Sequence, residues 1–471
     1  MFESLVVPDP GPAAVASPPA AGTSGAGQKP TDARELLSGV LSLLPVLEVR
    51  DLDEEALVDV ITTAEAAKNA LAGLQARAEV ALDGRVRARQ EAAGLDRAKL
   101  GADVHAQVAL ARSESPNTGH RLLGLAKAVV NEMPHTHHAL ATGRLSEWRA
   151  TMLVKETACL TREERGMVDE QLLADPSVLD GVGTKTLIAR ARRLAYAASP
   201  SAVADRARQA VKDRRVSLRP APDTMSILTG LLPVVEGVSV LKALTVEADR
   251  LVGVGDGRSR GQIMADTLVE RVTGQAVAGQ VRLEVQVVMT DRTLFQGDAE
   301  PAHLPGYGIV PAQVGRDLVR RAGGLGVAEA GDVPGTGDDE ARVPVVASAE
   351  GLAWIRRLYT APGTGELVGM DSRARFFPPG LARFIAARDQ TCATAWCDAP
   401  VRHHDHIHPW AAGGRTTAAN SNGLCADCNY VKEAPGWKAA TVPGDRHTTV
   451  TTTPTGHVYR SQAPPLPGDT S

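Results

Sequence analysis

Four of the five cysteines in this 471-residue chain fall within one short window. They form two pairs, Cys392-x4-Cys397 and Cys425-x2-Cys428, separated by 27 residues. Tetrahedral zinc takes thiolate ligands at about 2.3 Å, and short loops with paired cysteines supply these ligands two at a time. The alternative is four unconnected cysteines in a reduced protein. The pairing predicts a closed, structural zinc site that pins two loops poor in large apolar residues.

A second group of polar residues lies between and beside the cysteine pairs. It comprises Asp405-His406, a Gly-Gly pair at 413–414, Asn420 and Asn429. Carboxylate and amide oxygens suit Mg²⁺ or Mn²⁺, and an imidazole can accept a proton from water near neutral pH. Such a set could hydrolyse phosphodiesters, with the ion neutralising phosphate oxygens while the base generates hydroxide. An isolated Asp-His pair is more often a solvated turn, but the rest of the pattern argues against that interpretation.

The stretch DHIHPWAAGGRTTAANSNGLCADCNYVK resembles the HNH endonucleases, whose ββα-metal fold is a short hairpin followed by a helix. The resemblance implies a general base at His406 and metal ligands at Asp405 and Asn429. It implies that Asn420 ties the loop together and that Lys432 is the basic residue one turn later. The four cysteines match the zinc-stapled branch of the family. Asn429 stands where the family has its third His. The asparagine favours an oxygen-preferring ion over zinc at the catalytic position.

Charge is distributed unevenly along the chain. The whole sequence has 51 Lys and Arg against 55 Asp and Glu, a net charge of −4, which excludes a protein that coats nucleic acid through overall basicity. Residues 373–438 have a net charge of +3, as a local phosphate-binding site requires. We expect DNA contacts from four of the basic residues in this region, Arg383, Arg388, Arg415 and Lys432. A solvated helix face explains Arg383 and Arg388 equally well.

Composition divides the chain into five parts. We expect a disordered Pro/Ala/Gly-rich tail at 1–31, a mainly helical domain at 32–320 and a flexible acidic Gly-rich linker at 321–342. The HNH module with its zinc should occupy 343–440, followed by a hairpin and a Pro-rich tail at 441–471. The fold class is therefore a mainly α N-terminal region with a few short strands, a small zinc-stapled α+β domain near the C-terminus, and disordered termini.

Helical signals dominate the long N-terminal region. Apolar residues recur at spacings of three, four or seven; they are Leu57, Ile61, Ala64, Leu71, Leu74, Ala78 and Leu82. Thr161 and Glu164 have the spacing of a capping box, and Gly143 can end a helix before Ser146 starts the next. Strands are expected after Arg214, around a Pro-rich turn, and at 281–289, where VRLEVQVVM alternates with period two. A hairpin is expected around Pro454-Thr455-Gly456.

The same region resembles the helical domain of unknown function 222, which precedes HNH modules in many proteins of high-GC bacteria. The resemblance is carried by GRLSEWRATMLVKE, RRVSLRPAPDTMSILTGLLP and DGRSRGQIMADTLVE. It supplies no catalytic residues, and its possible roles are target binding or oligomerisation. Two basic runs, at 190–193 and 206–215, could bind DNA, but salt-bridged surface helices explain them as well.

These observations predict a metal-dependent DNA endonuclease with structural Zn²⁺ and catalytic Mg²⁺ or Mn²⁺. The alternative is a non-catalytic nucleic-acid-binding zinc module on a helical oligomerisation scaffold. We expect a cytoplasmic protein without a membrane segment, because no apolar run reaches the ~20 residues of a spanning helix and no secretory signal is evident. Cutting both strands would need two active sites, so a homodimer is compatible with the prediction.

Overall fold

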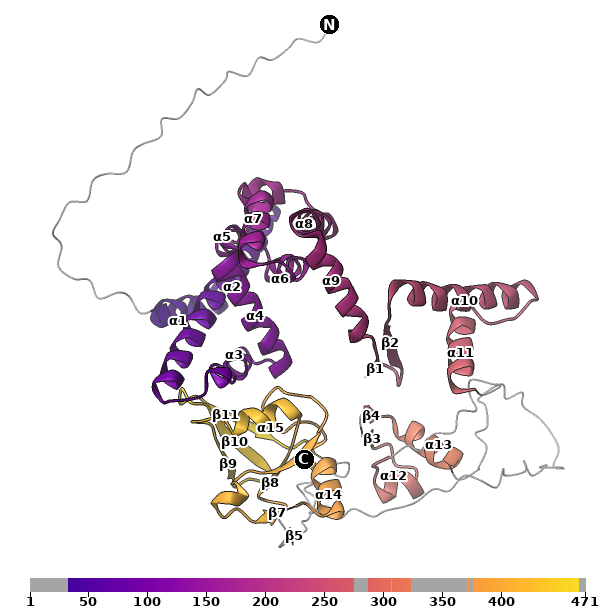
Figure 1. Ribbon diagram of the computed structural model, residues 1–471. Helices are drawn as coiled ribbons and strands as arrows, with labels where there is room; N and C mark the ends of the chain where they lie inside the picture. Colours follow the sequence, from indigo (N-terminus) through magenta and orange to yellow (C-terminus); the bar gives the residue numbers. More distant parts are fainter. Residues whose placement is uncertain (1–32, 275–286, 306, 323–370, 373–375, 466–471) are drawn as a thin grey trace, which may run out of the picture. The chain divides into compact units, whose positions relative to one another are not determined.

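The computed structural model describes five stretches of the chain: residues 33–274, 287–305, 307–322, 371–372 and 376–465 (Figure 1). The tail predicted at 1–31 and the linker predicted at 321–342 fall almost entirely outside these residues. Of the described residues, those up to position 64 belong to one compact unit and those from position 65 onward to a second. The first contains α1 (Ala33–Leu43), η1 (Leu44–Val46) and the beginning of α2 (Glu54–Ala92).

The second unit begins with the predicted helical domain. Seven helices follow α2: α3 (Val104–Ala111), α4 (Pro116–Glu132), α5 (Pro134–Ala141), α6 (Glu147–Glu156), α7 (Arg162–Leu173), α8 (Thr184–Ala198) and α9 (Pro200–Ala210). Their largest core cluster is aliphatic and includes Met133, Leu145 and Leu153, all fully buried. The predicted capping box at Thr161 and Glu164 is present, and Ser146 caps α6. These caps satisfy N–H groups that the first turn of a helix leaves without partners.

The buried face of α2 differs from the predicted stripe. Ile61 is 69% exposed and Leu71 is 43% exposed, so the expectation that they face the core is wrong. The buried positions instead include Glu79, Asp83 and Gln90. These polar residues are buried because distant groups pair with them: Arg112 with Glu79, Lys127 with Asp83, and the Gly101 N–H and Asp103 with Gln90.

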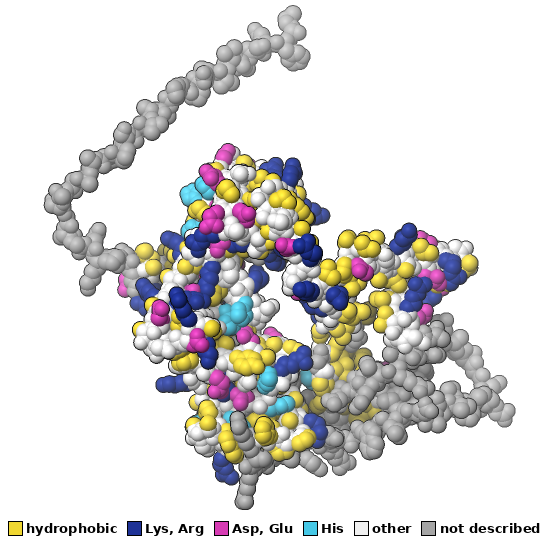
Figure 2. Space-filling model, in the orientation of Figure 1, with side chains coloured by type: hydrophobic (Ala, Val, Ile, Leu, Met, Phe, Trp, Pro, Cys, Tyr) yellow, Lys and Arg dark blue, Asp and Glu magenta, His cyan; other side chains and the backbone are white. Residues whose placement is uncertain are grey.

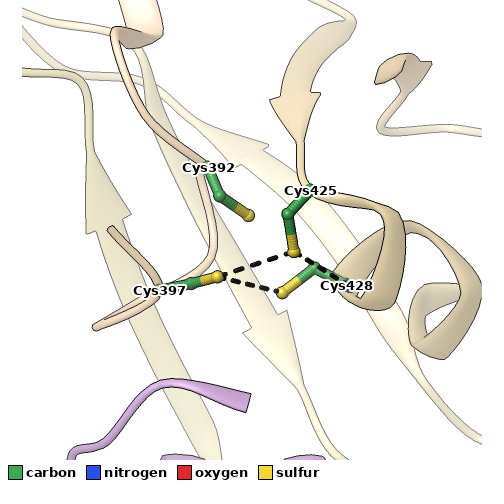
Figure 3. A group of neighbouring side chains, drawn as sticks. All are labelled: Cys392, Cys397, Cys425 and Cys428. Carbon is green, nitrogen blue, oxygen red and sulfur yellow. Dashed lines mark hydrogen bonds between the residues drawn. The ribbon is translucent and has the colours of Figure 1, made fainter. Parts of the chain in front are cut away.

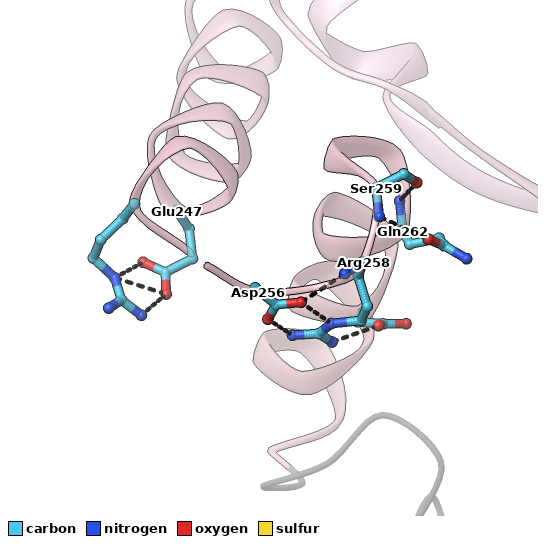
Figure 4. Close-up of polar contacts among 7 residues, drawn as sticks. Glu247, Asp256, Arg258, Ser259 and Gln262 are labelled. Carbon is cyan, nitrogen blue, oxygen red and sulfur yellow. Dashed lines mark hydrogen bonds and ion pairs between the residues drawn. The ribbon is translucent and has the colours of Figure 1, made fainter. Parts of the chain in front are cut away.

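The hairpin predicted after Arg214 is formed by β1 (Arg215–Pro220) and β2 (Ser226–Leu231), which pair antiparallel. It leads into α10 (Val234–Gly253) and α11 (Arg260–Thr273). In the turn between the two helices Arg258 pairs with Asp256, and a capping box starts α11 (Figure 4). Apolar side chains gather on the surface of β2 and α10 (Figure 2).

Residues 287–322 form a small αβ segment. It contains α12 (Asp291–Phe295), β3 (Ala302–Leu304), β4 (Gly308–Val310) and α13 (Ala312–Ala322). Most of the strand predicted at 281–289 lies outside the described residues. At its described end, Val288 makes an isolated antiparallel bridge to His303.

The C-terminal region contains the predicted hairpin and helix. After β5 (Asp371–Ser372) and α14 (Pro379–Asp389), β6 (His403–His406) pairs antiparallel with β8 (Ser421–Leu424), and α15 (Ala426–Lys432) follows directly. The short strand β7 (Thr416–Thr417) pairs with β5. This arrangement is the small α+β domain that the sequence predicts, and it places β6 and α15 next to each other.

The chain then forms a three-stranded antiparallel sheet. Its strands are β9 (Lys438–Val442), β10 (Thr448–Thr452) and β11 (Val458–Gln462), with β10 in the centre. The hairpin predicted around Pro454-Thr455-Gly456 is confirmed, because β10 and β11 pair on either side of it and the Gly456 N–H donates to the Thr453 carbonyl. The third strand, β9, was not predicted.

Candidate active site and metal centre

The four paired cysteines meet at one point (Figure 3). Their sulfur atoms all lie within 4.8 Å of one another. The Cys397 Sγ is 3.6 Å from the Cys425 Sγ and 3.5 Å from the Cys428 Sγ. Zinc–sulfur bonds of about 2.3 Å in a tetrahedron separate sulfurs by roughly 3.8 Å, whereas a disulfide would bring them to about 2.05 Å. The spacing fits a four-thiolate metal centre, and all five cysteines are free thiols.

Two structural elements deliver these ligands. Cys392 and Cys397 lie on the loop after α14, while Cys425 caps α15 by accepting a hydrogen bond from the Cys428 N–H at 3.4 Å. Hydrogen bonds among the thiols lower the pKa of Cys392 and Cys425 and raise the pKa of Cys397 and Cys428. Four thiolates would repel one another, so a divalent cation is the group that lets all four ionise together.

The Asp405 carboxylate faces helix α15. Its Oδ2 lies 2.8 Å from the Nζ of Lys432, which also donates to the backbone oxygen of His406 at 3.2 Å. Asn429 precedes Lys432 by three residues on α15 and so shares its side of the helix. The Asn429 Oδ1 is buried and has no hydrogen-bond partner among the described residues. An orphaned buried oxygen on the side of α15 that carries Lys432 is free to bind a cation that prefers oxygen ligands.

The His406 ring lies in a different environment from the Asp405 carboxylate. His406 ends β6 and is buried, and its Nε2 is 2.9 Å from the hydroxyl of Thr416. The ring centroids of Phe377 and Trp410 lie 4.7 and 5.8 Å away. A hydrogen bond at one ring nitrogen fixes the orientation of an imidazole. The structure therefore brings Asp405 to the α15 side, whereas Thr416 and two aromatic rings hold the His406 ring.

Asn420 ties together the loop between β6 and β8. Its side-chain oxygen accepts from the His408 N–H at 2.8 Å, and its Nδ2 donates to the carbonyls of His408 at 3.1 Å and Arg415 at 2.8 Å. A Cβ on Gly414 would collide with the His408 carbonyl, so the loop closes tightly only with glycine there. These contacts match the loop-tying role that the family resemblance implies for Asn420.

Arg388 is not on the surface, and the expectation that it contacts DNA is wrong. Only 4% of the residue is exposed. Its guanidinium pairs with Asp389 and donates to the carbonyls of Ala418 at 2.6 Å and Ser421 at 2.7 Å. Asp389 in turn accepts from the Gly423 N–H at 2.6 Å. A buried charge persists only when it is paired and hydrogen-bonded, so this pair joins α14 to β8.

The other predicted DNA contacts differ in their exposure. Arg383 and Arg415 are exposed. The Lys432 side chain is only 14% exposed and has three partners in the protein, namely Asp405, Glu433 and the His406 carbonyl. Burial lowers the pKa of Lys432, but hydrogen bonds to Asp405 and Glu433 outweigh that effect and raise it. Lys432 is therefore a counter-charge for Asp405.

Sequence reasoning missed several residues of this region. Thr416 lies next to the predicted loop, but its partner His406 is ten residues away and only the folded hairpin brings them together. His447 was also missed; its Nε2 is 2.9 Å from the Asn422 Oδ1 and links the C-terminal sheet to β8. Asp427 was also missed, although its position between Cys425 and Cys428 places it next to the predicted zinc site.

Comparison with known families agrees with this architecture. A family model described as "Domain of unknown function (DUF222)" matches residues 59–347, and one described as "HNH endonuclease" matches residues 395–434. No curated protein and no solved structure matches the chain. Among the described residues, no helix combines the length and apolar character needed to cross a membrane. The chain belongs to the DUF222 family, and an HNH endonuclease domain follows its DUF222 region.

Proposed function

We propose that the protein is a metal-dependent DNA endonuclease and that the HNH domain hydrolyses phosphodiester bonds. The observation that carries the proposal is the buried Asn429 Oδ1, which lacks a partner among the described residues and lies on the helix that faces the Asp405 carboxylate. A structural domain gains nothing from an unsatisfied buried oxygen, which costs about 1–3 kcal/mol. A cation site explains that cost.

The proposed roles combine the HNH resemblance with the contacts of each residue. Asp405 and Asn429 would hold Mg²⁺ or Mn²⁺, which when bound neutralises charge on the scissile phosphate. His406 accepts a proton from the attacking water as the water oxygen bonds to phosphorus and the bond to the leaving oxygen breaks. Thr416 orients the His406 ring, and Asn420 holds the loop that connects β6 to β8.

The cysteine centre has an architectural role in this proposal. We propose that Cys392, Cys397, Cys425 and Cys428 bind Zn²⁺, because all four ligand positions are protein thiolates and none is left for substrate. Such thiols must stay reduced, which supports the proposal of a reducing compartment such as the cytoplasm. The exposed Arg383 and Arg415 remain the proposed backbone-phosphate contacts, which position DNA without reading its sequence.

One observation favours a second function, a non-catalytic DNA-binding zinc module. The Lys432 ammonium already gives Asp405 a counter-charge without any metal ion. In this alternative the HNH domain only docks on DNA and the helical domain serves as an oligomerisation scaffold. The alternative leaves the Asn429 Oδ1 unexplained, and for this reason we favour the nuclease.

Plasmid cleavage separates the two functions. Supercoiled DNA should be nicked or linearised with Mg²⁺ or Mn²⁺ and stay intact with EDTA. Asn429→Ala should abolish cutting, whereas Asn131→Ala, on an exposed helical position, should cut like the parent. Zinc content should match across all three proteins, as expected if each keeps its cysteine centre. If the parent binds the plasmid without cutting it under any divalent ion, the non-catalytic module is correct.

A further inference from the structure

Three side chains outside the HNH site lie close together, one each from α3, α4 and α15. The Asp427 Oδ2 lies 3.1 Å from the Nε2 of His105, and its Oδ1 lies 3.8 Å from the Nε2 of His120. The two imidazole rings stack with centroids 3.5 Å apart and an interplanar angle of 13°. One potential ligand atom from each of the three residues lies within 4.8 Å of the other two.

We propose that His105, His120 and Asp427 bind a divalent transition-metal ion of the zinc type. Two imidazoles and one carboxylate are a common ligand set for Zn²⁺, with the fourth position taken by water. Imidazole also binds Co²⁺ and Ni²⁺, whereas Mg²⁺ and Ca²⁺ prefer oxygen ligands alone. The site is therefore chemically distinct from both the four-thiolate centre and the oxygen ligands proposed at Asp405 and Asn429.

The surroundings allow an ion to enter. A surface hollow lies beside two of the three residues and is lined by His120, Asp427, Asn117 and the loop of Cys397. The His105 side chain is 5% exposed, whereas those of His120 and Asp427 are 58% and 37% exposed. A metal ion lies close to the plane of each imidazole it binds, so the stacked rings must tilt apart on binding. His120 can make that movement because its ring is open to solvent.

Binding would have a structural consequence. His105 lies on α3 and His120 on α4 of the DUF222 region, whereas Asp427 lies on α15 of the HNH domain between Cys425 and Cys428. Close by, the Trp437 Nε1 donates to the Asp103 Oδ2 at 3.0 Å. An ion held by these ligands would clamp the two family regions together beside the helix that carries Asn429.

Metal counting on the full-length protein tests this proposal. The protein is stripped of metal under reducing conditions, reloaded with Co²⁺, and desalted. We expect two tightly bound ions in the parent and one in His120→Ala. The thiolate-to-cobalt charge-transfer absorption should be the same in both proteins, because the ion that His120→Ala loses has no thiolate ligand. His138→Ala, which removes an exposed histidine elsewhere on the helical domain, should retain two ions.

Asp427→Asn provides a second variant that keeps the size of the side chain. It should lower the affinity for the second ion by at least about 10- to 100-fold, the range typical of losing even an outer-shell partner of a metal ligand. Added Zn²⁺ should raise the melting temperature of the parent above that of the parent with one bound ion. The melting temperature of His120→Ala should not change. If the parent binds a single ion, or if His120→Ala binds as many ions as the parent, the three residues form a metal-free contact and the proposal is wrong. None of these measurements depends on DNA cleavage.

Discussion

The Lys432 ammonium lies 2.8 Å from the Asp405 carboxylate and bridges helix α15 to strand β6. The same lysine donates to the His406 carbonyl, so it braces the end of β6 where both predicted functional residues lie. Because it supplies positive charge at the proposed metal position, Lys432 competes with a divalent ion for Asp405.

Replacement of Lys432 should therefore tighten metal binding. In Lys432→Gln we expect the half-saturating Mn²⁺ concentration for cleavage to fall about fivefold, which corresponds to roughly 1 kcal/mol for a partly buried charge pair. A titration of plasmid nicking against Mn²⁺ measures this change. Lys438→Gln, at an exposed position on β9, is the matched control and should not shift the curve. A higher Mn²⁺ requirement in Lys432→Gln would show that the lysine assists metal binding.

Thr416 should act as a positioning residue for His406. Thr416→Val removes the hydroxyl that contacts the His406 Nε2 and keeps the shape of this buried side chain. We expect kcat to fall tenfold or more, by analogy with groups that orient a catalytic histidine, while KM changes little. The pH–rate profile should also shift, which a purely structural defect would not cause. Thr441→Val, at an exposed position on β9, should leave kcat and the pH–rate profile unchanged.

Removal of the paired thiols should cost the chain one zinc ion. We expect the double variant Cys425→Ser, Cys428→Ser to bind one zinc fewer than the parent and to lose cooperative unfolding of the HNH domain, because structural zinc supplies folding free energy directly. Metal analysis and thermal melting measure the two effects. Cys159→Ser is the matched control, since Cys159 lies outside the cluster. A folded double variant with the zinc content of the parent would rule out the four-thiolate centre.

His447 should make the protein less stable in acid. Burial lowers the pKa of His447 to about 4, below the value of 6.5 for a solvent-exposed histidine. Between these values the unfolded chain binds a proton that the folded chain excludes. The contribution of neutral His447 to the free energy of unfolding is therefore fully present above pH 6.5. It is lost as the pH falls towards 4, by about 3 kcal/mol in total.

Urea denaturation at several pH values tests this effect. Between pH 6.5 and 5 the free energy of unfolding should fall more steeply with decreasing pH in the parent than in His447→Gln. His457→Gln, at an exposed position directly before β11, should follow the parent. Parallel curves for the parent and His447→Gln would show that His447 titrates normally in the folded protein.

Local sequence signals predicted the local structure well. The capping residues Ser146 and Thr161, the hairpin at 454–456 and the grouping of the cysteine pairs all depend on groups a few residues apart or on one short window. The HNH pattern predicted the hairpin followed by a helix because Asp405, Asn420 and Asn429 occur at fixed spacings in that fold.

Features that depend on distant partners could not be predicted in this way. Glu79 is buried on α2 because Arg112, 33 residues away, pairs with it, so apolar periodicity alone selected the wrong face. Arg388 resembled a surface cation, yet the Ser421 carbonyl 33 residues later accepts from its guanidinium. Asp427 and His105 are 322 residues apart, and no local pattern connects them.

The central claim is that His406 is the base of a DNA-cleaving site. The most direct test is the single-turnover rate of plasmid nicking by His406→Ala with saturating Mn²⁺, alongside the parent and the exposed control His408→Ala. We predict that His406→Ala is slower by at least about 100-fold while its zinc content is unchanged, and that His408→Ala nicks at the parent rate. Nicking by His406→Ala at the parent rate would contradict the assignment.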